Sequence, residues 1–239
     1  LLMLSKTKLR PTREDRRLDR EILSEIFTIG LPALGTTFVS CFGYIAFARM
    51  VSGMGTTIFA AHSIAITAEQ IVYIPGYGLR VATSTLVGNA LGEKDIRKLK
   101  ATERVSILIT LLIMVVNGIG LYLFAYPFMR LFTNSVNAAR IGSEMLRLVS
   151  FSEPFFGLMI VLEGISYGMG RTKHVFACEA VSMWGIRIFG TFLCVNVFGL
   201  GLKAVWLCMI ADNICKAILL YIFRPKHVEE NADDRGALR

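Results

Sequence analysis

Residues 105–129 read VSILITLLIMVVNGIGLYLFAYPFM, a stretch of 25 residues without a formal charge. A helix needs about 20 predominantly apolar residues to cross the hydrocarbon core of a bilayer. Hydrocarbon offers the backbone no hydrogen-bond partner, so a segment that spans it must be helical. Residues 26–48 form a second uncharged stretch, of 23 residues. Both stretches predict membrane-spanning helices.

The composition of the whole chain agrees with these two segments. Its 239 residues are 54% hydrophobic and only 18% charged, and the mean hydropathy is +0.57. A soluble domain carries about 25% charged residues, and its buried helices are shorter and more amphipathic than these. The predicted fold class is therefore an all-α integral membrane protein.

The apolar segments predict a bundle of six transmembrane helices. We expect spans at about 24–49, 57–88, 103–127, 138–169, 174–198 and 202–223. This divides the chain into a basic cytoplasmic connector (1–20), a six-helix transmembrane lobe (21–224) and a polar cytoplasmic tail (225–239). The chain starts at Leu1 rather than at a methionine, which predicts either a fragment of a longer protein or a natural half-size protein.

Lysines and arginines gather in alternate connectors between the spans. Sixteen of them border one side of the membrane and three border the other. Those on the first side are Lys6, Lys8, Arg10, Arg13, Arg16, Arg17, Arg20, Lys94, Arg97, Lys98, Lys100, Arg104, Arg171, Lys173, Arg224 and Lys226, and those on the other are Arg130, Arg140 and Lys203. Cytoplasmic loops carry this excess, so the pattern predicts a multi-pass protein of the cell (inner) membrane with both termini in the cytoplasm.

Several function classes find no support in the sequence. The net charge of +8 lies in the connectors between apolar segments, whereas nucleic-acid-binding domains carry a basic patch on a soluble body. The chain has no G-x-x-x-x-G-K-[ST], H-E-x-x-H or G-x-S-x-G motif, so neither nucleotide hydrolysis nor these hydrolase chemistries is indicated. We expect no enzyme activity, no metal and no cofactor, and no nucleic acid as a partner.

Helix-breaking residues interrupt two of the predicted spans. Pro75 and Gly76 lie near the middle of the second span, and Pro154 lies near the middle of the fourth. A proline inside a helix removes a backbone hydrogen bond and kinks the helix. Bent helices often line the substrate route of secondary transporters, although proline and glycine are also common in ordinary membrane helices. We expect these three positions to act as hinges.

Charged and amide side chains at membrane depth are candidates for a substrate or cation pathway. Such residues are costly in hydrocarbon, so they face the protein or a water-filled cavity. The candidates are Glu69, Gln70, Glu153, Arg187, Asp212 and Asn213. Glu153 is the carboxyl group that we expect to couple transport to a proton or cation, with a single interhelical hydrogen bond as the alternative role.

The spacing of the remaining charges limits how they can pair. Asp212 and Lys216 are four residues apart, so we expect them to pair on one helix. Glu179 and Arg187 are eight residues apart, which is roughly 12 Å along a helix and too far for a direct bridge. Arg187 then needs a partner on another helix, either Glu153 or Asp212. Glu69 and Glu163 lie away from the span centres and are expected to reach the interface.

Four short stretches resemble the multidrug and toxic compound extrusion (MATE) transporters, in particular the C-terminal half. Residues 85–95 read TLVGNALGEKD, similar to the family element TLVGQALGAGD, and residues 164–172 read GISYGMGRT, similar to the turn GALRGAGDT. Residues 184–188 (WGIRI) are similar to a family W-x-x-R segment, and residues 29–33 (IGLPA) resemble the start of a lobe. The four stretches occur in order between about residues 21 and 223.

The resemblance implies a six-helix bundle equivalent to the C-terminal lobe of a twelve-helix transporter, with the N-terminal lobe absent from this chain. It also implies alternating-access export of organic, often cationic compounds against H⁺ or Na⁺, the choice of ion being open. Arg171 replaces an aspartate of the family turn, and Phe156 stands where the sodium-coupled branch has an aspartate. These departures favour the DinF-like branch.

The side chains expected to contact substrate lie on the second and fourth spans. They are Tyr73, Tyr77, Phe155, Phe156 and Met159. Aromatic faces and methionine suit large apolar cations, although packing would explain the same residues. Two alternatives stay open. One is a lipid-linked oligosaccharide flippase or exporter of the same superfamily, for which Arg80 and Arg187 are the span arginines available. The other is a membrane scaffold or enzyme without transport activity.

Overall fold

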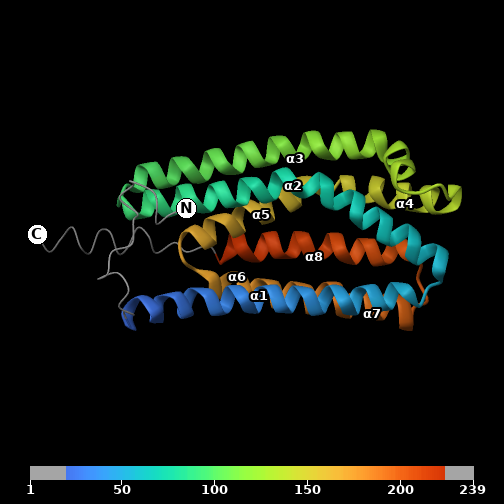
Figure 1. Ribbon diagram of the computed structural model, residues 1–239, viewed down its shortest axis with the longest axis horizontal. Helices are drawn as coiled ribbons and strands as arrows, with labels where there is room; N and C mark the ends of the chain where they lie inside the picture. The colour runs from blue at the N-terminus through green and yellow to red at the C-terminus, as the bar shows by residue number, and fades with distance from the viewer. Residues whose placement is uncertain (1–19, 224–239) are drawn as a thin grey trace, which may run out of the picture.

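The computed structural model describes residues 20–223, and all of the regular structure in this range is helical (Figure 1). The elements are α1 (Arg20–Ser52), α2 (Thr56–Gly92), α3 (Ile96–Phe132), α4 (Val136–Ser150), α5 (Glu153–Gly168), α6 (Thr172–Ser182), the π-helical turns η3 (Met183–Ile188) and η4 (Leu193–Val197) flanking α7 (Phe189–Phe192), and α8 (Leu202–Ile222). The predicted connector and tail lie outside this range, except for Arg20, which begins α1.

The helices are long and apolar enough to account for the predicted spans. Five helical segments of the described range could each cross a membrane, and the bent pair α4–α5 makes a sixth if it is counted as one span. The predicted six-helix architecture is therefore confirmed. Large apolar side chains are exposed along the outside, for example Leu112 and Leu123 on α3. An exterior of this kind suits contact with lipid rather than with water.

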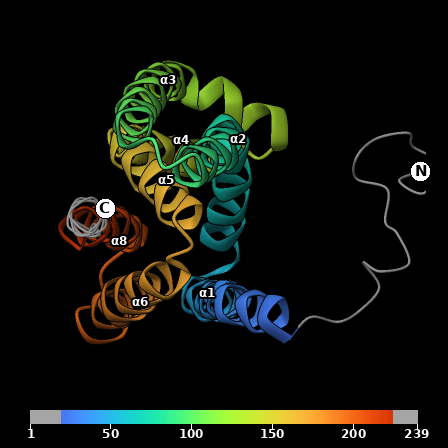
Figure 2. The same cartoon turned by 90° about the vertical axis from the view of Figure 1, so that its left-hand side faces the viewer.

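The long helices run side by side along one axis (Figure 1). Viewed along that axis, α2 and α3 lie on one side of the bundle and α1 and α6 on the other, with α5 between them (Figure 2). Polar side chains at the turns fix where helices begin. The Asp95 carboxylate accepts a hydrogen bond from the Lys98 backbone N–H (2.9 Å) and caps α3, a preferred role for aspartate at this position.

The fourth span is broken rather than merely kinked. Helices α4 and α5 meet at an angle of 61° across residues 151 and 152. Pro154 lies in the first turn of α5, where the missing backbone N–H costs nothing because that group has no helical partner anyway. Pro75, in contrast, lies inside the unbroken α2, which changes direction near its middle (Figure 1).

Glycines on α5 allow this helix to lie directly against α2. A Cβ atom built on Gly164 would lie 2.7 Å from the Arg80 carbonyl oxygen, and one built on Gly168 would lie 2.5 Å from that of Ser84. Small residues permit such close backbone approach between membrane helices. The two glycines belong to the stretch 164–172 that resembles a family turn, and they bring the side chains of α5 opposite those of α2.

Candidate functional site

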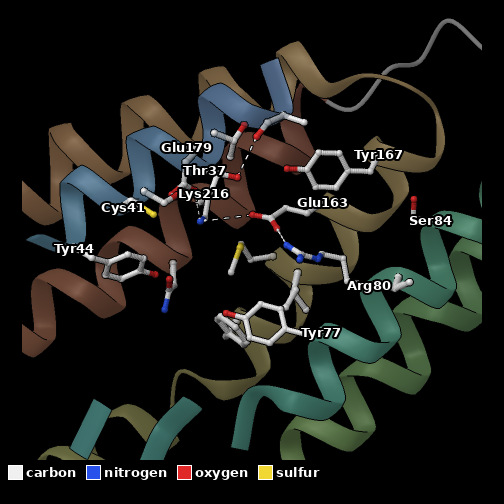
Figure 3. Close-up of a pocket in the computed structure, with 18 of the residues that line it drawn as sticks. Thr37, Cys41, Tyr44, Tyr77, Arg80, Ser84, Glu163, Tyr167, Glu179 and Lys216 are labelled. Carbon is white, nitrogen blue, oxygen red and sulfur yellow. Dashed lines mark hydrogen bonds and ion pairs between the residues drawn. The ribbon is translucent and has the colours of Figure 1, made fainter. Parts of the chain in front are cut away.

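A cavity of about 540 Å³ opens between α1, α2 and α5, with α6 and α8 contributing to its wall. Figure 3 shows most of the side chains that surround it. The residues that line the cavity are Ala33, Thr36, Thr37, Ser40, Cys41, Tyr44, Tyr77, Arg80, Val81, Ser84, Thr85, Phe156, Met159, Ile160, Glu163, Tyr167, Glu179, Asn213 and Lys216. The volume lies within the range of about 300–1,000 Å³ that is usual for ligand pockets.

Two cations and two carboxylates form a network in the wall of this cavity. The Lys216 ammonium lies 2.5 Å from a carboxylate oxygen of Glu179 and 3.6 Å from one of Glu163. Glu163 also binds the Arg80 guanidinium at 3.1 Å, and the Ser40 hydroxyl donates to Glu179. The dashed lines of Figure 3 mark the links that Lys216 and Arg80 make to Glu163. The formal charges that line the cavity therefore cancel.

A second ion pair lies behind the cavity, on a π-helical turn. The Arg187 Nε is 2.8 Å from a carboxylate oxygen of Asp212, and its Nη2 donates to the Asn213 side-chain oxygen at 3.3 Å. The guanidinium lies 5.4 Å from the ring centroid of Tyr44 and 5.8 Å from that of Phe47. Arg187 belongs to η3; such π turns shift the side-chain register of a helix and often occur at functional sites.

These contacts confirm one predicted pairing, overturn another, and correct the predicted location of Glu163. Asp212 is the partner that Arg187 needed on another helix. The predicted local pair of Asp212 and Lys216 is wrong, because Lys216 instead binds Glu179 and Glu163 from α6 and α5. Both side chains share one face of α8, and facing helices bring oppositely charged groups closer to each of them. The expectation that Glu163 reaches the interface is also wrong, since it is buried in this network.

Aromatic rings connect the cavity to a buried carboxyl group. Phe156 stacks on Tyr73 with ring centroids 3.8 Å apart, and Tyr77 meets the edge of Phe156 at 6.1 Å. The Tyr73 hydroxyl donates to Glu69. Glu69 is only 2% exposed, so the expectation that it reaches the interface is wrong as well: it lies behind the aromatic wall instead.

Glu153 is the least satisfied polar residue of the site. It is fully buried at the start of α5, and neither carboxyl oxygen has a hydrogen-bond partner. Its side chain packs against Gly118 of α3, where an added Cβ would lie 3.2 Å from the Glu153 Cβ. Its carboxyl group is within electrostatic range of Glu69. An unpaired carboxylate at such a position is costly, so the group is either neutral or accompanied by a cation.

The structure brings together most of the predicted pathway residues. Phe156, Met159 and Asn213 line the cavity directly. Tyr73 and Arg187 contact these lining residues, and Glu69, Asp212 and Glu153 lie behind them.

Other predicted positions lie apart from the cavity. Gln70 is exposed on α2, and Phe155 is 46% exposed and does not line the cavity, so the predicted substrate contact of Phe155 finds no support in this cavity. Gly76 is buried against Met114, whose Cε an added Cβ would meet at 2.4 Å, which is a packing role. The hinge function of Pro75, Gly76 and Pro154 stays a prediction.

Sequence reasoning left Glu163, Glu179, Lys216 and Arg80 out of the predicted pathway. The signal that could have found them is charge balance. A charge at membrane depth usually needs a partner, and these four remain, beside Glu69 and Glu153, once Arg187 is assigned to Asp212. Their assembly from α2, α5, α6 and α8 is a property of the tertiary structure.

Comparisons with known proteins agree on one family. A model of the MatE family matches residues 32–193. The chain is 30% identical over 201 residues to a probable multidrug resistance protein NorM of Thermotoga maritima, covering 83% of this chain and 43% of that protein. It is 27% identical over 227 residues to a probable NorM of Photorhabdus laumondii, covering 93% and 50%.

Solved structures support the same fold. A MATE crystal structure in the bent conformation superposes with a TM-score of 0.87 at 20% identity, covering 96% of this chain and 51% of that one. The Vibrio cholerae MATE transporter VcmN in its bent form gives 0.80 at 16% identity, covering 90% and 49%. The chain thus spans about half the length of the relatives and structures it matches.

Proposed function

Because the chain belongs to the MatE family of transporters, we propose that it forms one six-helix lobe of a secondary active multidrug exporter. A second six-helix lobe would supply the opposite wall, and the two would rock around a central cavity. The substrates are organic, often cationic compounds, exchanged for H⁺ or Na⁺. The similarity to proteins named as multidrug resistance proteins supports this class of substrate.

The cavity between α1, α2 and α5 is the observation that carries the proposal. Its lining side chains come from α1, α2, α5, α6 and α8 (Figure 3). Tyr44, Tyr77 and Phe156 give it aromatic faces, which attract organic cations through the electron density of the ring. Met159 adds a flexible apolar contact. Glu163 and Glu179 already have cationic partners, so the rings rather than free carboxylates would provide the main attraction.

Glu153 is the residue that we assign to ion coupling. Its buried carboxyl lacks a hydrogen-bond partner. Three neighbouring residues link it to the cavity: Glu69 acts on it electrostatically, Tyr73 donates to Glu69, and Phe156 stacks on Tyr73. Gain or loss of a proton or cation there would change the charge directly behind the aromatic wall. We expect Glu153→Gln to lower ion-driven efflux while leaving expression intact. Efflux equal to that of the wild type would remove Glu153 from the mechanism.

Efflux measured with the intact transporter tests the proposal. The transporter is placed in liposomes under separate pH and Na⁺ gradients, and export of an organic cation such as ethidium is followed by fluorescence. Phe156→Ala should weaken apparent substrate affinity roughly 2- to 30-fold, since one aromatic–cation contact contributes about 0.5–2 kcal/mol. The neighbouring Phe155→Ala is the matched control because Phe155 lies outside the cavity. No efflux under either gradient, or equal loss in both variants, would contradict the proposal.

Export of a lipid-linked oligosaccharide is the second candidate function. The net charge of the residues that line the cavity argues against it. Arg80 and Lys216 offer positive charge to an anionic carrier, but both are bound to carboxylates. Arg187 lies outside the cavity, bound to Asp212. A cavity without excess positive charge suits an organic cation better than a diphosphate. The DinF-like assignment, the cell-membrane location and the cytoplasmic position of both termini remain parts of this proposal.

A further inference from the structure

Two pockets adjoin on the outer surface of the bend between α4 and α5. The larger of the two has a volume of about 490 Å³ and is lined by Val115, Gly118, Ile119, Tyr122, Leu123, Ser150, Phe151 and Pro154. The other has a volume of about 370 Å³ and is lined by Tyr122, Glu144, Met145, Arg147, Leu148, Phe151 and Lys203. Tyr122 and Phe151 line both, so the two pockets form one groove, here called the bend groove.

The outer end of the bend groove carries positive charge. The Arg147 guanidinium lies 6.0 Å from the ring centroid of Tyr122, and no carboxylate among residues 20–223 lies within ion-pair distance of it. Lys203 binds Glu144 at 3.1 Å, and Glu144 is the lone carboxylate lining the groove. One cation therefore remains without a counter-charge, next to a lysine whose ion pair is itself exposed.

The inner end of the groove is apolar and reaches into the membrane-spanning part of α3. From Tyr122 to Val115 the groove follows α3 for roughly 10 Å, at 1.5 Å per residue. Phe151 is 71% exposed at the bend and packs edge-on against Tyr122, with ring centroids 5.4 Å apart. Lys203 is the second residue of α8, which places the charged end of the groove at the end of a predicted span.

We propose that the bend groove binds one phospholipid with a net negative headgroup. Arg147 and Lys203 receive the headgroup phosphate, and an acyl chain lies along α3 towards Pro154. Charge complementarity supports this occupant, because an unpaired arginine beside a hydrocarbon-facing slot matches a lipid that is anionic at one end and apolar at the other. The groove shares no lining residue with the cavity between α1, α2 and α5, so the two sites are separate.

A bound chain would fill the angle between α4 and α5 from outside, against Pro154 and Ser150. The Ser150 carbonyl on the inner side packs on Gly118, which also contacts Glu153. Occupancy of the groove would thus stabilise the 61° bend and the position of the buried Glu153 carboxyl. The lipid acts here as a structural ligand of the bent span.

Native mass spectrometry of the detergent-purified protein tests this site. The protein is incubated with phosphatidylglycerol or with phosphatidylcholine, and the fraction carrying one lipid is measured. We expect a preference for phosphatidylglycerol, and Arg147→Gln should reduce it roughly fivefold, the effect of one cation beside an anionic headgroup. Ile119→Trp should reduce binding of both lipids, because the indole fills the apolar end of the groove.

Two variants serve as matched controls. Arg140→Gln removes an exposed arginine two turns away on the same helix, and Leu112→Trp adds an indole to an exposed position of α3 outside the groove. Neither should change lipid binding. The proposal is overturned if Arg147→Gln leaves the preference intact, or if Ile119→Trp binds lipid as the wild type does. It is also overturned if Ile119→Trp abolishes a dimer while the protein shows no lipid preference.

Discussion

Replacement of Lys216 by methionine is the sharpest test of the buried network. The ammonium is the sole cationic partner of Glu179 among the described residues, at 2.5 Å. Glu163 would keep Arg80 at 3.1 Å, and Glu179 would keep only the hydroxyl of Ser40. Methionine has a similar length and apolar stem, so the variant removes the charge with little change in packing. The main consequence is a buried Glu179 without a counter-ion.

The size of the effect follows from that loss. Removal of one partner of a buried ion pair costs about 3–5 kcal/mol, because the remaining charge stays desolvated and uncompensated. For a chain of about 150–250 residues, 1 kcal/mol shifts the midpoint of thermal unfolding by roughly 2–4 °C. Lys216→Met should therefore lower the midpoint by about 6–20 °C. The double variant Lys216→Met/Glu179→Gln should recover most of the shift, since it removes both charges.

Thermal unfolding of the purified protein in detergent, followed by tryptophan fluorescence, measures these midpoints. Lys98→Met is the control, because its ion pair with Glu93 is exposed and such pairs contribute about 0–1 kcal/mol. A double variant as unstable as Lys216→Met would refute the reasoning, since the loss would then not come from an orphaned carboxylate. Equal midpoints for Lys216→Met and Lys98→Met would refute it too, because the network would then behave as a solvated surface pair.

Three further predictions concern packing, the buried carboxyl and topology. Gly164→Ala should destabilise the protein by about 1–3 kcal/mol, because its Cβ would overpack against the Arg80 carbonyl, whereas Gly78→Ala, with open space around it, should be neutral or stabilising in the same unfolding assay. Tyr73→Phe should cost about 1–3 kcal/mol by leaving Glu69 without its donor, and Tyr77→Phe in the cavity wall should cost less; equal midpoints would contradict the role of that hydrogen bond. In a cysteine-free background, Lys98→Cys should resist an impermeant maleimide in intact cells while Gly53→Cys reacts; labelling of Lys98→Cys alone would reverse the proposed topology, and labelling of both would contradict the predicted crossing of α2.

Much of the architecture could be read from local sequence. The charge-free stretch at 105–129 must be helical in hydrocarbon whatever it packs against, and it lies inside α3. The order of the six spans and the likeness to one transporter family were predicted in the same way. The break in the fourth span was harder, because Pro154 indicates a bend without saying that residues 151 and 152 leave the helix altogether.

The ion-pair partners of the buried charged residues could not be predicted from residue spacing along the chain. Spacing favoured Asp212 with Lys216, yet Asp212 binds Arg187 and Lys216 binds Glu179 and Glu163. Residues four apart lie on the same face of a helix. This spacing does not predict which charged residue of another helix will contact that face. That depends on how closely helices approach, and here Gly164 and Gly168 set the contact of α5 with α2.

The sequence alone thus determined that the chain spans a membrane, how many times, and which residue types must be kept from lipid. These outcomes follow from the cost of exposing backbone and charge to hydrocarbon, which each segment meets separately. Only the tertiary structure decided that charges from α2, α5, α6 and α8 meet in one wall, that Glu153 is left without a partner, and where the cavity lies. Those features arise from the relative placement of helices distant in sequence, which close packing between them fixes.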